Sequence, residues 1–251
     1  MLTLDTYVQA IVAEGGRFAA AVAADGADSP VPTCPGWTVR DLVLHQSEVH
    51  RWATAVIANS IAKPSAVPAD VVGTPPDNTE LVPWLQQGVD GLVAALSSAP
   101  DDLSAFTFLA DAPRPQLFWA RRQTHETEIH RVDAESVRGA LTPFDAALAA
   151  DGIDEMLTGF VPRPNTRLRS APATTLAIET TDHPGSWHLS ISDEPVVTSR
   201  SQEGEADCTV RGGASDVYLA LWNRQGIEPL DIAGDPGVLE LFRSGVKISW
   251  R

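Results

Sequence analysis

Residues 118–135 read Phe-Trp-Ala-Arg-Arg-Gln-Thr-His-Glu-Thr-Glu-Ile-His-Arg-Val-Asp-Ala-Glu, a polar run without proline or glycine. We expect it to belong to a helix that begins at Pro115 or Gln116 and ends at Gly139. Glu126 and His130 stand four residues apart, so a helix places both side chains on one side, one above the other. Such pairs bind metal ions in many proteins, but they also occur on solvated helix surfaces, so the spacing alone leaves both readings open.

A third candidate ligand comes from an earlier helix, predicted from the N-cap Thr38, with Asp41 completing a capping box, to about Ile61. A helical wheel places His45 inside the apolar face and His50 at the edge of that face, closer to solvent. The other residues of this face are Leu42, Val49, Trp52, Ala53 and Val56. The wheel therefore directs His45 toward the core.

Two imidazoles and a carboxylate in a core are costly to desolvate unless they are compensated. A divalent cation held by His45, Glu126 and His130 compensates all three, and this set suits zinc better than nickel, iron or manganese. Three protein ligands leave a coordination position open, as in catalytic sites. Asp133 is expected to accept a hydrogen bond from a ligand histidine, whereas His125 faces another side of the helix. The alternative is a core histidine satisfied by Glu126 alone.

The spacing of apolar and turn residues predicts a four-helix bundle, with helices near residues 3–24, 38–61, 79–97 (capped by Thr79) and 115–139. The pattern changes after Pro143. We expect a helix over 144–160, helices from Ser215 to Trp222 and from Pro236 to about Ser244, and an α+β second half. The predicted strands are 174–180, 187–192, 196–199, 208–211 and 246–250. The predicted domains are therefore 1–142 and 143–251.

The composition is that of a globular protein, with 43% hydrophobic and 20% charged residues among 251. A formal net charge of −15 argues against nucleic acid and anionic membranes as partners. Cys34 and Cys208 are the two cysteines, and they form neither a disulfide framework nor a CxxC pair. Cys34 is expected to be a packed structural thiol. With no visible signal peptide or membrane span, we expect a cytoplasmic protein.

Two motifs resemble a known family. Residues 32–45, Pro-Thr-Cys-Pro-Gly-Trp-Thr-Val-Arg-Asp-Leu-Val-Leu-His, are similar to the start of the maleylpyruvate isomerase-type amino-terminal domain, a DinB-like metal-binding four-helix bundle of mycothiol-dependent enzymes. The pattern from Trp119 to Glu135 resembles the metal-binding helix of that domain. The resemblance implies that the zinc ligands of the family correspond to His45, Glu126 and His130.

The second half also resembles this family. Residues 213–224, Gly-Ala-Ser-Asp-Val-Tyr-Leu-Ala-Leu-Trp-Asn-Arg, and 232–235, Ile-Ala-Gly-Asp, are similar to its smaller, sterol-carrier-like second domain. Members of the family carry a functional arginine there, and Arg224 matches it best, so the resemblance implies a catalytic role for Arg224. A surface arginine that caps the preceding helix is the alternative. Asn223 stands where the family usually has glycine.

The resemblance implies a zinc-dependent isomerase or S-transferase with mycothiol as thiol cosubstrate and a small electrophile as substrate. A maleylpyruvate-like acid is one such electrophile, but no residue identifies it. Two alternatives remain open at this stage. One is a metal-dependent hydrolase that activates water, and the other is a metal-binding protein without catalytic activity.

Overall fold

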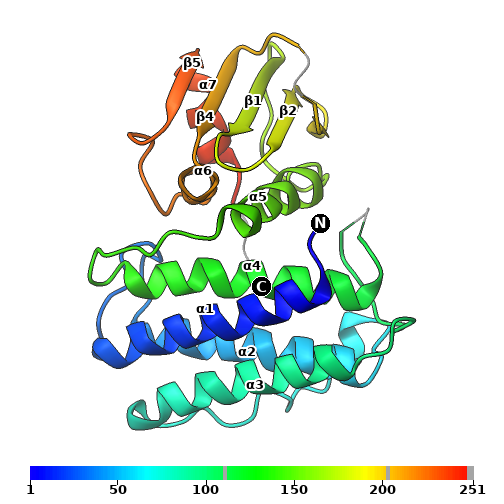
Figure 1. The fold of residues 1–251 in the computed structure, drawn as a ribbon, viewed down its shortest axis with the longest axis vertical. Helices are drawn as coiled ribbons and strands as arrows, with labels where there is room; N and C mark the ends of the chain where they lie inside the picture. Colours follow the sequence, from blue (N-terminus) through cyan, green and yellow to red (C-terminus); the bar gives the residue numbers. More distant parts are fainter. Residues whose placement is uncertain (110–111, 202–203, 248–251) are drawn as a thin grey trace. The chain divides into compact units, whose positions relative to one another are not determined.

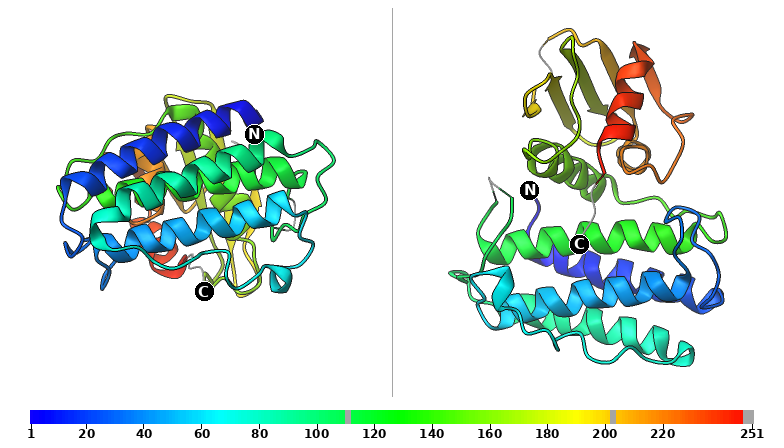
Figure 2. Two further views of the ribbon diagram at one scale, coloured as in Figure 1. Left: turned by 90° about the horizontal axis from the view of Figure 1, so that it is seen from below. Right: turned by 180° about the vertical axis from the view of Figure 1, so that it is seen from behind.

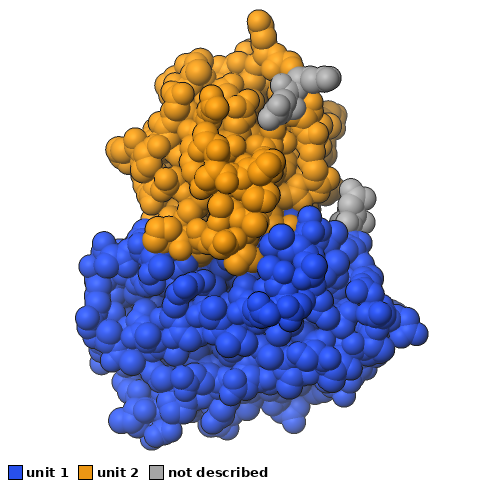
Figure 3. All heavy atoms as spheres, viewed as in Figure 1, with its two compact units in different colours: residues 1–142 blue, residues 143–251 orange. Residues whose placement is uncertain are grey.

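A computed structural model describes residues 1–109, 112–201 and 204–247 of the chain. The chain divides into two units, Met1–Thr142 and Pro143–Arg251, which are coloured separately in Figure 3. We describe each unit by itself.

Four long helices make up most of the described part of the first unit (Figures 1 and 2). They are α1 (Leu4–Ala24), α2 (Val39–Ala58), α3 (Leu81–Ser98) and α4 (Pro115–Glu135). Helices α1 and α2 each pack against both α3 and α4. The first unit is therefore the helical bundle that the sequence predicts.

The helix starts follow from local side chains. The Thr3 side chain accepts a hydrogen bond at the start of α1, and Pro115 occupies the first turn of α4. The predicted Thr79 cap of α3 is wrong, because Thr79 lies in a 3₁₀ turn, Asn78–Glu80, and the α-helix begins at Leu81. This later start keeps Pro83 in the first turn, where a missing N–H breaks no intrahelical bond.

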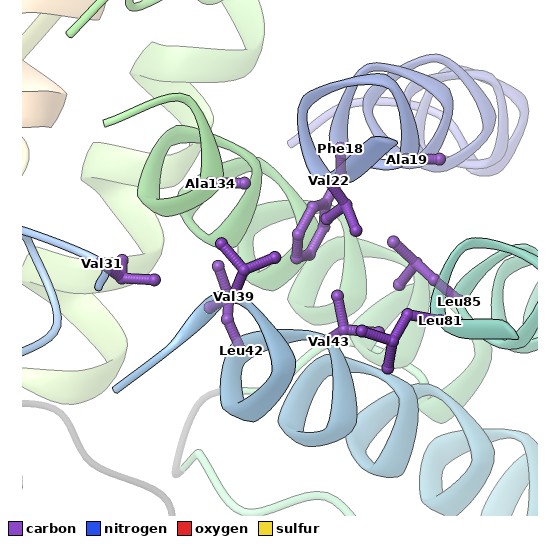
Figure 4. Packing of buried hydrophobic residues seen from close by; sticks show 10 residues of the cluster. All are labelled: Phe18, Ala19, Val22, Val31, Val39, Leu42, Val43, Leu81, Leu85 and Ala134. Carbon is purple, nitrogen blue, oxygen red and sulfur yellow. The ribbon is translucent and has the colours of Figure 1, made fainter. Parts of the chain in front are cut away.

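An apolar cluster fills one end of the bundle, as Figure 4 shows. Its residues come from all four helices and from the loop before α2. They are Phe18, Ala19, Val22, Val31, Val39, Leu42, Val43, Leu81, Leu85 and Ala134. Burial of such side chains supplies the main stabilising free energy of the unit.

Helix α4 differs from the other three helices because it is buried along nearly its whole length although it is rich in charged residues. Polar groups of the same unit compensate these charges. Arg131, which is fully buried, donates to Glu14 at 2.8 Å and to Glu135 at 2.7 Å. The Thr124 hydroxyl donates to a carbonyl oxygen of its own helix at 2.9 Å. The interior of the bundle is thus partly ionic.

The described residues of the second unit form a mixed five-stranded sheet in the order β3-β2-β1-β4-β5. The β1–β4 pair is parallel and the other neighbours are antiparallel. The strands are β1 (Thr174–Thr180), β2 (Gly185–Ile191), β3 (Val197–Ser199), β4 (Cys208–Gly212) and β5 (Asp231–Gly234). Alternate residues of β1, β2 and β4 are buried, so one face of the sheet forms the core of this unit.

Helices α5 (Ala146–Asp154), α6 (Ala214–Leu221) and α7 (Pro236–Gly245) complete the second unit, with α7 packed on β1 and β4. The predicted helix 144–160 is found over residues 146–160, where α5 passes directly into a π-helical segment, Glu155–Phe160. Strand β5 was not predicted. The predicted strand 246–250 lies largely outside the described residues, since only Val246 and Lys247 of it are described and neither is in a strand.

A helical first half followed by a smaller α+β half confirms the predicted fold class. Within the described ranges, none of the helices combines the length and the apolar composition needed to cross a bilayer.

Candidate metal centre

The start of α2 positions the first candidate ligand. The Thr38 Oγ1 atom accepts a hydrogen bond from the Asp41 backbone N–H at 3.2 Å, and an Asp41 carboxylate oxygen accepts one from the Thr38 N–H at 2.9 Å. This capping box matches the predicted one and anchors the helix directly after the turn that contains Trp37. His45 follows in the second turn, and its side chain is 21% exposed.

The three predicted ligands converge. The Glu126 Oε1 atom lies 3.7 Å from His45 Nε2 and 3.3 Å from His130 Nε2. All three potential ligand atoms lie within 4.8 Å of one another, although His45 comes from α2 and the other two residues come from α4. The structure therefore brings together the residues that the sequence singled out.

A hydrogen bond at Nδ1, the ring nitrogen that does not face Glu126, orients the His130 side chain. Its Nδ1 atom donates to Asp133 Oδ2 at 2.8 Å, as expected for a ligand histidine, and Asp133 is fully buried. The Thr33 hydroxyl donates to the other Asp133 oxygen at 2.6 Å. Burial lowers the pKa of His130, but the hydrogen bonds to Asp133 and Glu126 outweigh it and raise the pKa to about 9. The site thus favours positive charge at the His130 Nε2 atom.

The groups around Glu126 likewise favour its charged form. Burial raises its pKa, but the nearby imidazoles of His130 and His45, together with the charges of His130 and Arg122, lower it well below the usual value. Arg122, 1% exposed, donates to Glu126 Oε2 at 3.2 Å. Glu126 is therefore an ionised carboxylate in a buried position, which is the state that a metal ligand needs.

These residues fit a divalent cation. Two imidazole nitrogens and one carboxylate oxygen converge from two helices, the second nitrogen of His130 is already engaged by Asp133, and the carboxylate is ionised. A cation among the three donors would replace the positive charge that His130 otherwise supplies. Because His45 is partly exposed, one side of the cluster reaches the protein surface.

Two residues that the sequence did not connect with the site lie beside it. The Trp37 ring lies 5.0 Å from the His45 ring and stacks on the His130 ring at 6.4 Å between centroids. The Cys34 sulfur lies within 4.8 Å of ligand atoms of His130 and Asp133, so these three form a second group that could hold a metal ion. Both residues belong to the motif 32–45, which also contains His45, so this motif lies beside the candidate ligands.

The predicted positions of His45 and His50 are reversed. His50 is fully buried, whereas His45 lies at the edge of the buried face. The His50 Nε2 atom is 2.9 Å from the Thr127 hydroxyl oxygen and 2.6 Å from the Gln46 amide nitrogen. The wheel was phased on apolar residues alone, so it could not anticipate that Gln46 and His50 are buried because they satisfy each other's hydrogen bonds.

His50 should make the unfolding free energy depend on pH. Burial lowers its pKa to about 3, so the folded protein keeps the ring neutral while the unfolded chain protonates it below about pH 6.5. Stability should therefore fall as the pH drops from about 6.5 toward 3, by up to about 1.4 kcal/mol per pH unit from this residue. Urea unfolding at several pH values should show that the free energy of unfolding depends less steeply on pH in His50→Gln than in the unmodified protein. An equal dependence in both proteins would contradict the role given to His50.

The remaining candidates lie elsewhere. His125, the competing histidine of α4, is buried and contacts Glu128 at 2.9 Å, away from the three ligand atoms, as its wheel position predicts. Arg224 lies in the second unit just after α6, half-buried, and donates to the Trp222 carbonyl at 2.9 Å. Its catalytic role stays a prediction. Asn223 has a φ of 58°, a left-handed conformation that suits asparagine as well as the glycine common in the family.

Comparisons with known proteins agree with this architecture. A crystal structure of the mycothiol-dependent maleylpyruvate isomerase has a TM-score of 0.63, 12% identity, and coverage of 92% of this chain and 93% of that one. A crystal structure of a mutant of that enzyme has the same TM-score and coverage with 13% identity. At such identity the likeness shows a shared fold. A search of curated protein sequences gave no match.

Family models cover most of the chain. The model of the mycothiol maleylpyruvate isomerase N-terminal domain matches residues 8–135, which include all three candidate ligands. The model of the corresponding C-terminal domain matches residues 147–241. The chain therefore belongs to the mycothiol-dependent maleylpyruvate isomerase family.

Proposed function

We propose that this protein is a metal-dependent enzyme that uses mycothiol to isomerise a small acidic substrate of the maleylpyruvate type. The observation that supports it most strongly is the convergence of His45, Glu126 and His130 within 4.8 Å on a partly exposed side of the bundle. Membership of the family supports the thiol and the reaction class. Zinc is the metal that this donor set favours.

A divalent cation at this position would act as a Lewis acid and lower the pKa of a thiol that coordinates it. The protein residues supply the remaining conditions. Asp133 fixes the His130 ring, and burial of Glu126 keeps competing water away from one side. The Trp37 ring, stacked on His130, gives the site an apolar wall against which a thiol or its substrate can pack.

Isomerisation needs a nucleophile that adds and leaves again. A thiolate that adds to an activated double bond leaves a single bond that can rotate, and its elimination then gives the trans isomer. A carboxylate substrate also needs a cation in so acidic a protein. We propose Arg224 for this role, because a guanidinium can bind a carboxylate through two hydrogen bonds.

The proposal is tested by metal analysis of the purified protein, followed by rate measurements with maleylpyruvate. We expect about one zinc ion per chain, and a rate that requires both the metal and mycothiol. Removal of the metal with a chelator should abolish the activity, and added zinc should restore it. Turnover without mycothiol would favour a metal-dependent hydrolase. A metal that binds neither thiol nor substrate would favour a protein without catalytic activity.

A further inference from the structure

Arg122 is a charged residue that neither the ligand set nor the apolar core explains. Its side chain is 1% exposed and lies one helical turn before Glu126 on α4. A guanidinium is unfavourable in a protein interior unless a carboxylate pairs with it, and a buried pair seldom adds net stability over an apolar replacement. The position of Arg122 is therefore best explained by its partner, Glu126.

The two oxygens of the Glu126 carboxylate have different partners. Oε2 accepts a hydrogen bond from Arg122 at 3.2 Å. Oε1 faces the Nε2 atoms of His45 and His130, at 3.7 and 3.3 Å. The arginine thus occupies one oxygen and leaves the other directed at the two histidines.

We infer that Arg122 is a positioning residue that makes Glu126 a one-oxygen metal ligand. This inference rests on the proposed function, because it presupposes a cation among the three donors. A carboxylate can bind a metal through one or both oxygens. If both oxygens of Glu126 bound the cation, the second would take a coordination position that the thiol requires. Arg122 prevents this by holding Oε2 in a charge-assisted hydrogen bond.

Arg131 offers a matched control on the same helix. It too is buried and pairs with a glutamate four residues later, Glu135, at 2.7 Å. At 3.6 residues per turn, however, it lies about 140° around the helix from Glu126. A variant at Arg131 therefore disturbs a buried ion pair of α4 without removing the partner of the candidate ligand.

The test uses cobalt(II) as a visible probe of coordination in the full-length protein. Cobalt absorbs strongly with four ligands and weakly with five or six, so the spectrum reports how many ligand atoms bind. Arg122→Gln, Arg122→Lys and Arg131→Lys are compared with the unmodified protein, by cobalt titration and by titration of the cobalt-loaded protein with mycothiol.

For Arg122→Gln we expect cobalt affinity to fall about 10- to 100-fold. The visible bands of the loaded protein should weaken, and the sulfur-to-cobalt band that follows thiol addition should decrease. Arg122→Lys, which keeps the charge and one donor, should give intermediate values. Arg131→Lys should keep both the spectrum and the affinity of the unmodified protein.

The outcomes separate the two proposals. If the unmodified protein binds no cobalt, the proposed function fails and this inference fails with it. If it binds cobalt, and Arg122→Gln gives the same bands and affinity, the inference alone is overturned. Equal losses in Arg122→Lys and Arg131→Lys would overturn it as well, because they would show that any buried ion pair of α4 has the same effect.

Discussion

Replacing His45 with alanine is expected to lower the affinity for zinc by more than about 100-fold, because the loss of a ligand exceeds the 10- to 100-fold effects of residues that only orient ligands. Stability should hardly change. The His45 side chain is 21% exposed and lies outside the buried network of α2, so the metal-free variant should unfold within about 1 kcal/mol of the unmodified protein. Competition with a zinc-sensitive dye and urea unfolding measure the two quantities.

His50→Gln is the matched control on the same helix. His50 is fully buried next to Thr127 and contributes no atom to the group of three donors. Its replacement should leave the zinc affinity unchanged and lower the free energy of unfolding by about 1–3 kcal/mol, because a buried polar partner loses its hydrogen bond. If His50→Gln lost zinc while His45→Ala kept it, the assignment of ligands would be wrong.

Replacing Arg131 with methionine should lower the free energy of unfolding by about 3–5 kcal/mol, because it removes the buried cation that Glu14 and Glu135 share. Their remaining partners, Arg17 and Thr142, compensate the carboxylates only in part. Methionine keeps the volume of the side chain, so the loss reports mainly on charge. Arg131 is fully buried and its guanidinium contacts Glu14 at 2.8 Å and Glu135 at 2.7 Å. Urea unfolding of the chelator-treated protein gives the value.

Arg138→Met serves as the exposed counterpart. The Arg138 side chain is 57% exposed, and its ion pair with Asp25 is open to solvent on the arginine side. Its loss should change stability by less than about 1 kcal/mol. If Arg131→Met also lowered the free energy of unfolding by less than about 1 kcal/mol, hydration or protonation of the carboxylates around Arg131 would cost little free energy.

The sequence predicted the helices well where side chains mark their ends. Thr38 and Asp41 identify the start of α2 because their capping box uses only local hydrogen bonds. Proline at the first position of α4 does the same. The short strand β5, Asp231–Gly234, was missed because its pairing with β4 depends on contacts between distant segments, which local patterns do not contain.

The candidate site was predicted in part. Spacing on α4 identified Glu126 and His130, because a helix fixes the relation of residues four apart. The phase of α2 was harder, since polar residues such as Gln46 and His50 are buried there. The partners of the ligands could not be ranked from the sequence. Nothing local distinguishes Arg122, which contacts the candidate ligand Glu126, from its buried neighbours on a helix full of charges.

The spacing of four side chains along α4 limits where residues can be inserted or deleted in this chain. Arg122, Glu126, His130 and Asp133 follow one another at steps of four, four and three residues, and each contacts the next through its side chain. One residue inserted or deleted among them would turn everything downstream by about 100° and separate the two halves of the row. A protein that keeps this row of contacts can therefore tolerate a change in the length of the loop between α2 and α3, but not a change in the number of residues between Arg122 and Asp133.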